Sequence, residues 1–185
     1  MFAGAALLRY RSARESRSIF FDWLIKSRID GLVLLVCIDA SVAMGFALAV
    51  TLPRAGNLGG GGFMVLHSAK TGKTITLDYR EVAPSGVTAQ HFLTPKGERS
   101  RKTKNSWHAM GVPGTVAGLY KAWYEYGSGK LTWQQVMQPA IDLADKGFIV
   151  NFDLAQLISA KSQWLLENKA TAKAFFKKDG DLYHA

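Results

Sequence analysis

One cysteine, Cys37, is all that the 185-residue sequence contains, which excludes a disulfide bond within the chain. Histidines are almost as sparse, and the spacing of His67, His91, His108 and His184 fits no metal-binding signature. Low-complexity stretches and internal repeats are also missing. We therefore expect neither a metal nor another cofactor, and an ordinary globular chain rather than a repeat protein.

Acidic residues are also in short supply, with 14 Asp and Glu against 23 Lys and Arg, so the net charge is +9. Such an excess is compatible with a nucleic-acid or membrane-surface partner. Much of it lies in Lys96–Lys104 and in the first thirty residues. No aromatic residue interleaves with Lys96–Lys104, so a stacking platform for single-stranded nucleic acid is missing. We predict a solvated loop and no nucleic-acid partner; a basic nucleic-acid-binding module stays an alternative.

The longest apolar run is Gly31–Val50, twenty residues with one charge, Asp39. Its length is that of a membrane-spanning helix. A carboxylate near the middle of such a span is costly in lipid. The second half, Ala40–Val50, consists largely of small residues that allow close helix packing. We predict a buried helix in which Asp39 hydrogen-bonds to backbone amides; a membrane-anchored protein with its span at 31–50 is the alternative.

The next segment has the pattern of a β-hairpin. A helix over Ile38–Thr51 ends before a proline and is followed by four glycines, Gly59–Gly62. Phe63–Ser68 and Thr74–Tyr79 read as two strands joined by a turn. A phosphate-binding loop leads from a strand into a helix, whereas this glycine run precedes a strand. We therefore predict that the glycines permit close backbone packing.

The remaining signals are typical of helices. Thr115–Tyr126 is predicted to be helical and to end at a glycine. Thr132 with Gln135 forms a capping-box pattern for the next helix. Asn151 is placed to cap one further helix that runs to Leu166. Helices combined with a hairpin indicate a mixed α+β fold.

Several blocks resemble the γ-glutamyltranspeptidase (glutathione hydrolase) family, and they occur in the family's order. They are IDASVAMGFALAV at 38–50, AGNLGGGGF at 55–63, DYREVAP at 78–84, GTVAG at 114–118, and QPA with GFIV at 138–140 and 147–150. The resemblance extends from residue 38 to the end. Residues 1–37 do not resemble the family, which normally has Gly-Gly-Asn-Ala where Leu34–Cys37 stands. We therefore divide the chain into an atypical N-terminal segment, 1–37, and an N-terminal portion of the family's large subunit, 38–185.

The resemblance implies a fold and an activity. Members are N-terminal-nucleophile hydrolases with an αββα sandwich, of which this chain would be an incomplete fragment. The precursor cuts itself, and the new N-terminal threonine of the small subunit attacks the γ-glutamyl amide of glutathione, forming an acyl-enzyme. No threonine here stands in the family's cleavage context, so no catalytic residue is assigned. We expect this chain alone to be inactive and to leave a sheet edge and an apolar face unpaired.

The resemblance also implies a substrate-binding residue, Arg80. In the family, the arginine of the Arg-Glu-x-Ala-Pro block binds the α-carboxylate of the γ-glutamyl group, for which a planar guanidinium is well suited. The alternative is a structural arginine at the end of a strand, paired with Glu81 or Asp78. Glu81 itself either orients Arg80 or has a structural role, which we favour. The implied partners are glutathione and other γ-glutamyl compounds and the precursor's small subunit, and the implied location is periplasmic, secreted or cell-surface.

Overall fold

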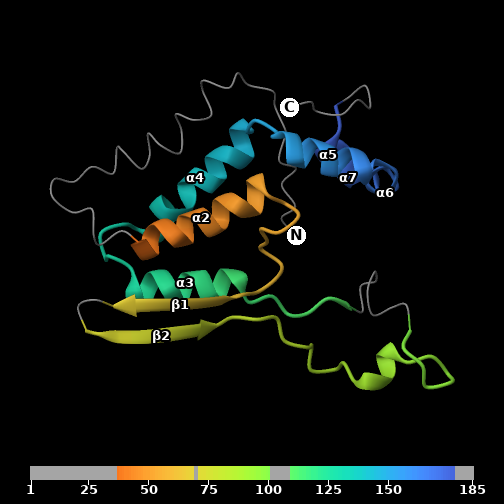
Figure 1. Ribbon diagram of the computed structural model, residues 1–185, viewed down its shortest axis with the longest axis horizontal. Helices are drawn as coiled ribbons and strands as arrows, with labels where there is room; N and C mark the ends of the chain where they lie inside the picture. The colour runs from red at the N-terminus through yellow and green to blue at the C-terminus, as the bar shows by residue number, and fades with distance from the viewer. Residues whose placement is uncertain (1–36, 69–70, 101–108, 178–185) are drawn as a thin grey trace. The chain divides into compact units, whose positions relative to one another are not determined.

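The computed structural model describes residues 37–68, 71–100 and 109–177, and it divides into two compact units. One unit contains the residues up to Asn57 together with those from Trp123 onward, and the other is Leu58–Ala122. The mixed α and β class predicted from the sequence is confirmed (Figure 1). The elements are α2 (Cys37–Thr51), β1 (Phe63–Ser68), β2 (Lys73–Asp78), η1 (Ala89–Phe92), α3 (Thr115–Tyr126), α4 (Trp133–Lys146), α5 (Phe152–Ala160), α6 (Ser162–Leu166) and α7 (Lys169–Phe175).

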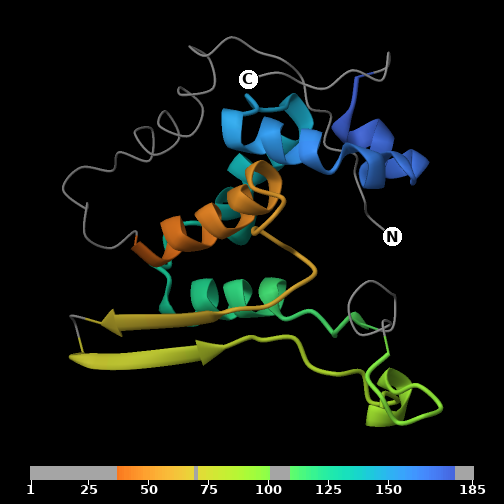
Figure 2. The same cartoon turned by 45° about the vertical axis from the view of Figure 1, so that its right-hand side comes forward.

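Two long helices, α2 and α4, form the centre of the first unit and lie side by side in both ribbon views (Figures 1 and 2). The small residues of α2 let α4 approach closely, and Val42 and Ala43 are fully buried. Phe46 of α2 meets Trp133 of α4 edge to face, with ring centroids 5.4 Å apart. The helix predicted over Ile38–Thr51 is thereby confirmed, and it is buried on one side, whereas Met44 and Leu48 are 47% and 39% exposed.

Asp39 lies at the start of α2 and is completely buried. Its Oδ2 accepts a hydrogen bond from the backbone N–H of Ser128 at 3.1 Å, as the prediction of a backbone-bonded carboxylate requires. Among the described residues no helix has the length and apolar character needed to cross a membrane. Residues 31–36 of the run that suggested a span lie outside the described residues.

Side-chain caps set the ends of the later helices. Thr132 and Gln135 form the predicted capping box of α4, and Asn151 accepts the Leu154 N–H at the start of α5. On the surface of α4, hydrogen bonds from Lys146 and Gln138 hold the pKa of Asp142 below its usual value.

The single helix predicted from Asn151 to Leu166 is wrong, because the helix is interrupted at Lys161, where φ is −112° and ψ is 8°. The hydrophobic core of this region consists of Phe148, Val150, Leu154, Ile158 and Phe176.

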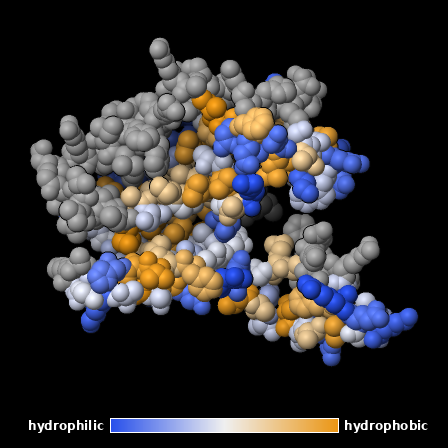
Figure 3. Space-filling model, viewed as in Figure 1, coloured by the Kyte–Doolittle hydropathy of each residue, from blue (hydrophilic) through white to orange (hydrophobic). Residues whose placement is uncertain are grey.

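The second unit is built on the predicted hairpin. β1 and β2 pair antiparallel from Phe63 opposite Asp78 to Ser68 opposite Lys73. Leu66 and Leu77 face the core, whereas Phe63 and Val65 point to the other face and are 64% and 70% exposed. Figure 3 shows hydrophobic side chains at the surface over β1 and α3. Within the described residues the sheet has only these two strands, so each has an unpaired edge, as expected from the sequence. The face that carries Phe63 and Val65 also carries Asp78 and Thr76.

Helix α3 runs beside the hairpin in both ribbon views (Figures 1 and 2). Its Gly118 lies directly against the ring of Tyr79, so closely that a methyl group there would overlap the ring. The first turn of α3 is tied to the glycine run, because the Gly60 carbonyl accepts hydrogen bonds from the N–H groups of Gly114 and Thr115 at 2.8 and 3.0 Å. These contacts hold Tyr79, the first residue after β2, in a fixed position.

Candidate substrate-binding site at Arg80

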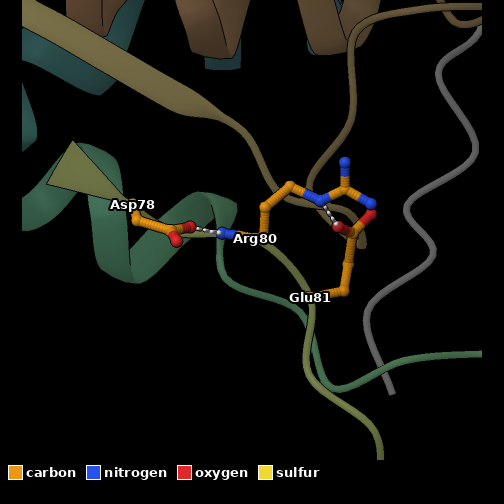
Figure 4. A network of polar contacts seen from close by, with 3 residues as sticks. All are labelled: Asp78, Arg80 and Glu81. Carbon is orange, nitrogen blue, oxygen red and sulfur yellow. Dashed lines mark hydrogen bonds and ion pairs between the residues drawn. The ribbon is translucent and has the colours of Figure 1, made fainter. Parts of the chain in front are cut away.

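Arg80 stands two residues beyond the end of β2. The Asp78 side chain accepts the backbone N–H of Arg80 through Oδ1 at 3.0 Å, as Figure 4 shows. Such a bond from an aspartate to the amide two residues on closes a local turn through a side chain and fixes the backbone there. The arginine is thereby presented at the exit of the hairpin.

The guanidinium of Arg80 is paired along one edge. Its Nε donates to Oε2 of Glu81 at 3.0 Å, and the two side chains are 60% and 34% exposed (Figure 4). An exposed pair of this kind adds less than about 1 kcal/mol to stability. In the described part of the chain, the terminal nitrogens of Arg80 have no hydrogen-bond partner. The pair with Glu81 thus fixes the side chain and leaves two parallel donors for a carboxylate.

An aromatic ring also lies beside the same guanidinium. The Cζ atom of Arg80 lies 5.7 Å from the ring centroid of Phe63, within the range of a cation–π contact. Three groups therefore act on Arg80: the Asp78 carboxylate on its backbone, the Glu81 carboxylate on Nε, and the Phe63 ring on the guanidinium.

The glycine run passes directly against the backbone of Arg80. A Cβ atom on Gly61 would lie 2.5 Å from the Tyr79 carbonyl oxygen, 2.7 Å from the Glu81 nitrogen and 2.8 Å from the Arg80 Cα. Gly62 continues the antiparallel pairing beyond the strand, because its carbonyl accepts the Tyr79 N–H at 3.0 Å. The prediction of close backbone packing is thus confirmed at Gly61, whereas Gly62 packs against the Tyr79 ring and a Cβ atom on Gly59 would meet nothing within 4 Å.

Glu81 is held from a second side by the segment that leads into α3. A Cβ atom on Gly111 would lie 2.8 Å from the Glu81 Cβ. The next residue of each segment completes the contact, because Val82 and Val112 exchange backbone hydrogen bonds of 3.3 and 2.8 Å. Both partners of the ion pair therefore rest on backbone that is fixed by close contacts.

A cavity of about 300 Å³ opens beside this pair. Its charged groups are Arg80 and Glu81, and the rest of its wall is mostly apolar. The remaining lining residues are Val82, Ala83, Pro84, Val87, Phe92, Ala109, Met110 and Gly111. A concave surface in which a positioned cation, already paired with Glu81, stands beside apolar residues can take a small ligand that carries a carboxylate.

Other candidates do not form a site. His67 contacts Thr74 and His91 contacts Thr88, so both have local hydrogen-bonding roles. Residues 37–68, 71–100 and 109–177 contain no group of His, Cys, Asp or Glu arranged to hold a metal ion. His108, His184 and part of the basic run at 96–104 lie outside the described residues.

Comparison with known families decides what kind of chain this is. The family model described as gamma-glutamyltranspeptidase matches residues 36–185. The chain belongs to the gamma-glutamyltranspeptidase family. The matched region is the N-terminal part of the large subunit in this family.

Curated relatives of this gamma-glutamyltranspeptidase chain come from distant organisms. It is 48% identical over 145 residues to the glutathione hydrolase proenzyme of Escherichia coli (strain K12), covering 78% of this chain and 24% of the relative. The chain is also 40% identical over 148 residues to the glutathione hydrolase proenzyme of Bacillus subtilis (strain 168), covering 78% of this chain and 24% of the relative. The chain therefore spans about a quarter of the length of these curated relatives.

Solved structures of gamma-glutamyltranspeptidases share the fold. The Helicobacter pylori structure matches with a TM-score of 0.76 and 35% identity, covering all of this chain and 50% of the other. The structure from Pseudomonas nitroreducens, complexed with L-DON, gives a TM-score of 0.66 and 35% identity, covering 92% and 48%. The mixed helical and hairpin arrangement thus corresponds to about half of each of these chains.

Sequence reasoning located Arg80 and its pairing partners but missed two contributors to the site. Phe63 was recognised only as the first residue of a strand. Gly111 was recognised only as part of a turn. Antiparallel register was the available signal for Phe63, because a hairpin from 63 to 78 brings its first residue next to the segment that follows its last. No signal local to Gly111 indicated that it packs against Glu81.

Proposed function

We propose that residues 38–185 are the N-terminal portion of the large subunit of a γ-glutamyltransferase or glutathione hydrolase. In the proposed reaction, the γ-glutamyl amide of glutathione is cleaved through an acyl-enzyme on a threonine of the small subunit. Backbone amides stabilise the tetrahedral oxyanion of that step. The completed protein would have the αββα sandwich and, as the family implies, a periplasmic, secreted or cell-surface location.

In this proposal Arg80 binds the α-carboxylate of the γ-glutamyl group. One observation carries it: the guanidinium is held by Glu81 at Nε, while its terminal nitrogens have no partner among the described residues. A purely structural arginine would also show the ion pair with Glu81. The cavity beside the pair and the family's use of an arginine in this block favour the substrate-binding role.

A graft tests the proposed function directly. Residues 38–185 replace the aligned stretch of the Escherichia coli proenzyme, to which this chain is 48% identical, and we name the product the graft enzyme. We expect it to mature into two chains and to release glutamate from glutathione. The 185-residue chain assayed alone is expected to release none. A graft enzyme that is soluble and folded but inactive, beside an active parent, would contradict the proposal.

Glu81→Gln in the graft enzyme is expected to raise the KM for a γ-glutamyl substrate about two- to fivefold at low salt. Glutamine keeps the size of the side chain and an acceptor for Nε, but it loses the charge that fixes the guanidinium. The effect should shrink as salt is added, because the pair is exposed and therefore screened.

Glu98→Gln is the matched control for this prediction. Glu98 is an exposed glutamate of the same unit, and it bonds to Thr94 through its backbone: its N–H donates to Thr94 Oγ1 and its carbonyl accepts the Thr94 N–H. We expect its KM to equal that of the unsubstituted graft enzyme. Equal KM values for the Glu81 and Glu98 variants at low salt would show that the ion pair does not orient Arg80.

A further inference from the structure

We propose that Phe63 is a second positioning residue for Arg80, acting through a cation–π contact with the guanidinium. The inference rests on the proposed function, because it assigns a residue that prepares the same substrate-binding arginine. The observation behind it is the 5.7 Å separation between the Arg80 Cζ and the Phe63 ring centroid. A cation at that distance over an aromatic ring is attracted by the negative charge density of the ring face.

The hairpin register makes this contact a consequence of the fold. Phe63 is the first residue of β1 and lies opposite Asp78, the last residue of β2. Arg80 follows Asp78 by two residues, so the alternation of side chains directs it to the same face as Phe63. The turn at Asp78 then holds the backbone of Arg80 in place.

The exposure of Phe63 also calls for an explanation. Its side chain is 64% exposed, so its ring gains little from burial. Val65, two residues along the same face, is 70% exposed, but no interaction with a charged group is found for it. Of these two exposed apolar residues, only Phe63 has an aromatic face, and it is the one beside the arginine.

Glu81 and Phe63 restrain the guanidinium in complementary ways. Glu81 hydrogen-bonds to Nε, an edge of the planar group. Phe63 contacts the planar group through its ring. An arginine side chain loses much rotational freedom on binding a ligand, and a side chain that is ordered beforehand loses less. The two contacts together leave the terminal nitrogens for the ligand and reduce the entropy lost when a carboxylate binds.

The test compares aromatic and aliphatic residues at position 63 of the graft enzyme. Phe63→Leu keeps an apolar side chain but removes the ring, and we expect the KM for a γ-glutamyl substrate to rise about two- to fivefold with kcat unchanged. Phe63→Tyr keeps the ring and is expected to retain the original KM. Val65→Ala removes apolar surface from the same face and is expected to leave both constants unchanged.

A double-mutant cycle separates positioning from a general effect on the hairpin. In an Arg80→Ala background, Phe63→Leu is expected to cause no further rise in KM. Loss of the ring should also shift the Nε–Hε resonance of Arg80 in the full 185-residue chain downfield, because a proton above an aromatic face is shielded. Neither result follows if Phe63 only supports the strand.

The outcomes distinguish the two proposals. An Arg80→Ala enzyme with unchanged KM would overturn the substrate-binding role of Arg80 and, with it, the role of Phe63. A large effect of Arg80→Ala combined with equal KM values for Phe63→Leu and Val65→Ala would overturn the role of Phe63 alone. A rise in KM of equal size in both Arg80 backgrounds, or a Phe63→Tyr enzyme as impaired as Phe63→Leu, would likewise overturn it.

Discussion

Arg80→Ala in the graft enzyme is expected to raise the KM for a γ-glutamyl substrate from roughly 30-fold to a few thousandfold. The range corresponds to about 2–5 kcal/mol, the cost of removing one partner from a desolvated, hydrogen-bonded charge pair. In the proposed complex the terminal nitrogens would supply two parallel donors to the α-carboxylate, whereas alanine would supply none. Glu81 would remain without its cation, which adds to the local excess of negative charge.

Arg80→Lys distinguishes charge from geometry at this position. Lysine keeps the positive charge but lacks the planar fork, so we expect a KM between those of the arginine and alanine enzymes. The decisive comparison uses a second substrate that lacks the α-carboxylate, a 4-aminobutyryl amide. All three enzymes should turn this substrate over with similar kcat/KM, since the interaction that distinguishes them is missing.

Arg54→Ala is the matched control for charge removal. Arg54 is also a surface arginine, 50% exposed, and its partner is Asp153 at 3.1 Å. Its removal lowers the net charge by the same amount as removal of Arg80, and we expect KM to stay within experimental error. A similar rise in KM for both arginine variants would mean that net charge, and not a specific carboxylate contact, determines substrate affinity.

Much of the local structure could be predicted from the sequence because its signals are local. The strand Phe63–Ser68 and the helix Thr115–Tyr126 have the predicted bounds, and the second strand is shifted by one residue. Alternation of apolar and polar residues, glycines at the ends of elements and side-chain caps all act within a few residues. The capping box at Thr132 is an example, since both of its bonds join residues three apart.

Other features of the fold could not be specified by the sequence pattern. The carboxylate of Asp39 was expected to meet backbone amides, but the amide that it meets belongs to Ser128, 89 residues away. The helix break at Lys161 was likewise not predictable, because no glycine or proline lies between Phe152 and Leu166 to indicate it. A tertiary arrangement decides both features, because packing overrides the helix propensity of a short segment.

Arg80 shows how the two kinds of information combine. Its family block identified the residue, whereas composition and periodicity alone favoured a structural role. The geometry is compatible with both interpretations, because the pair with Glu81 suits a structural arginine and terminal nitrogens without a partner among the described residues suit the proposed ligand-binding one. Phe63 and the glycine run, which pattern analysis assigned to strand and packing, also turn out to contact Arg80 or its backbone.

Gly61→Ala is expected to be strongly damaging, because a methyl group at this position would press on the backbone around Arg80. The added Cβ would lie 2.5–2.8 Å from backbone atoms of Tyr79, Arg80 and Glu81, none of which can rotate away as a side chain would. We expect the free energy of unfolding of the graft enzyme to fall by about 3 kcal/mol. Because the displaced backbone carries Arg80, kcat/KM should fall by roughly 100-fold, as a shift of about 1 Å in a positioning group does.

Gly59→Ala, in the same run of four glycines, is the control that makes this prediction specific. A Cβ atom on Gly59 would meet nothing within 4 Å, and its φ is not positive. Alanine there should be neutral or stabilise the protein by about 0.4–1 kcal/mol, because it restricts the unfolded chain. Thermal unfolding and kcat/KM measured on both variants check the pair. Equal losses of stability and kcat/KM in both variants would mean that the glycine run acts as a flexible segment. If neither variant lost stability or kcat/KM, the glycine run would not hold the backbone of Arg80.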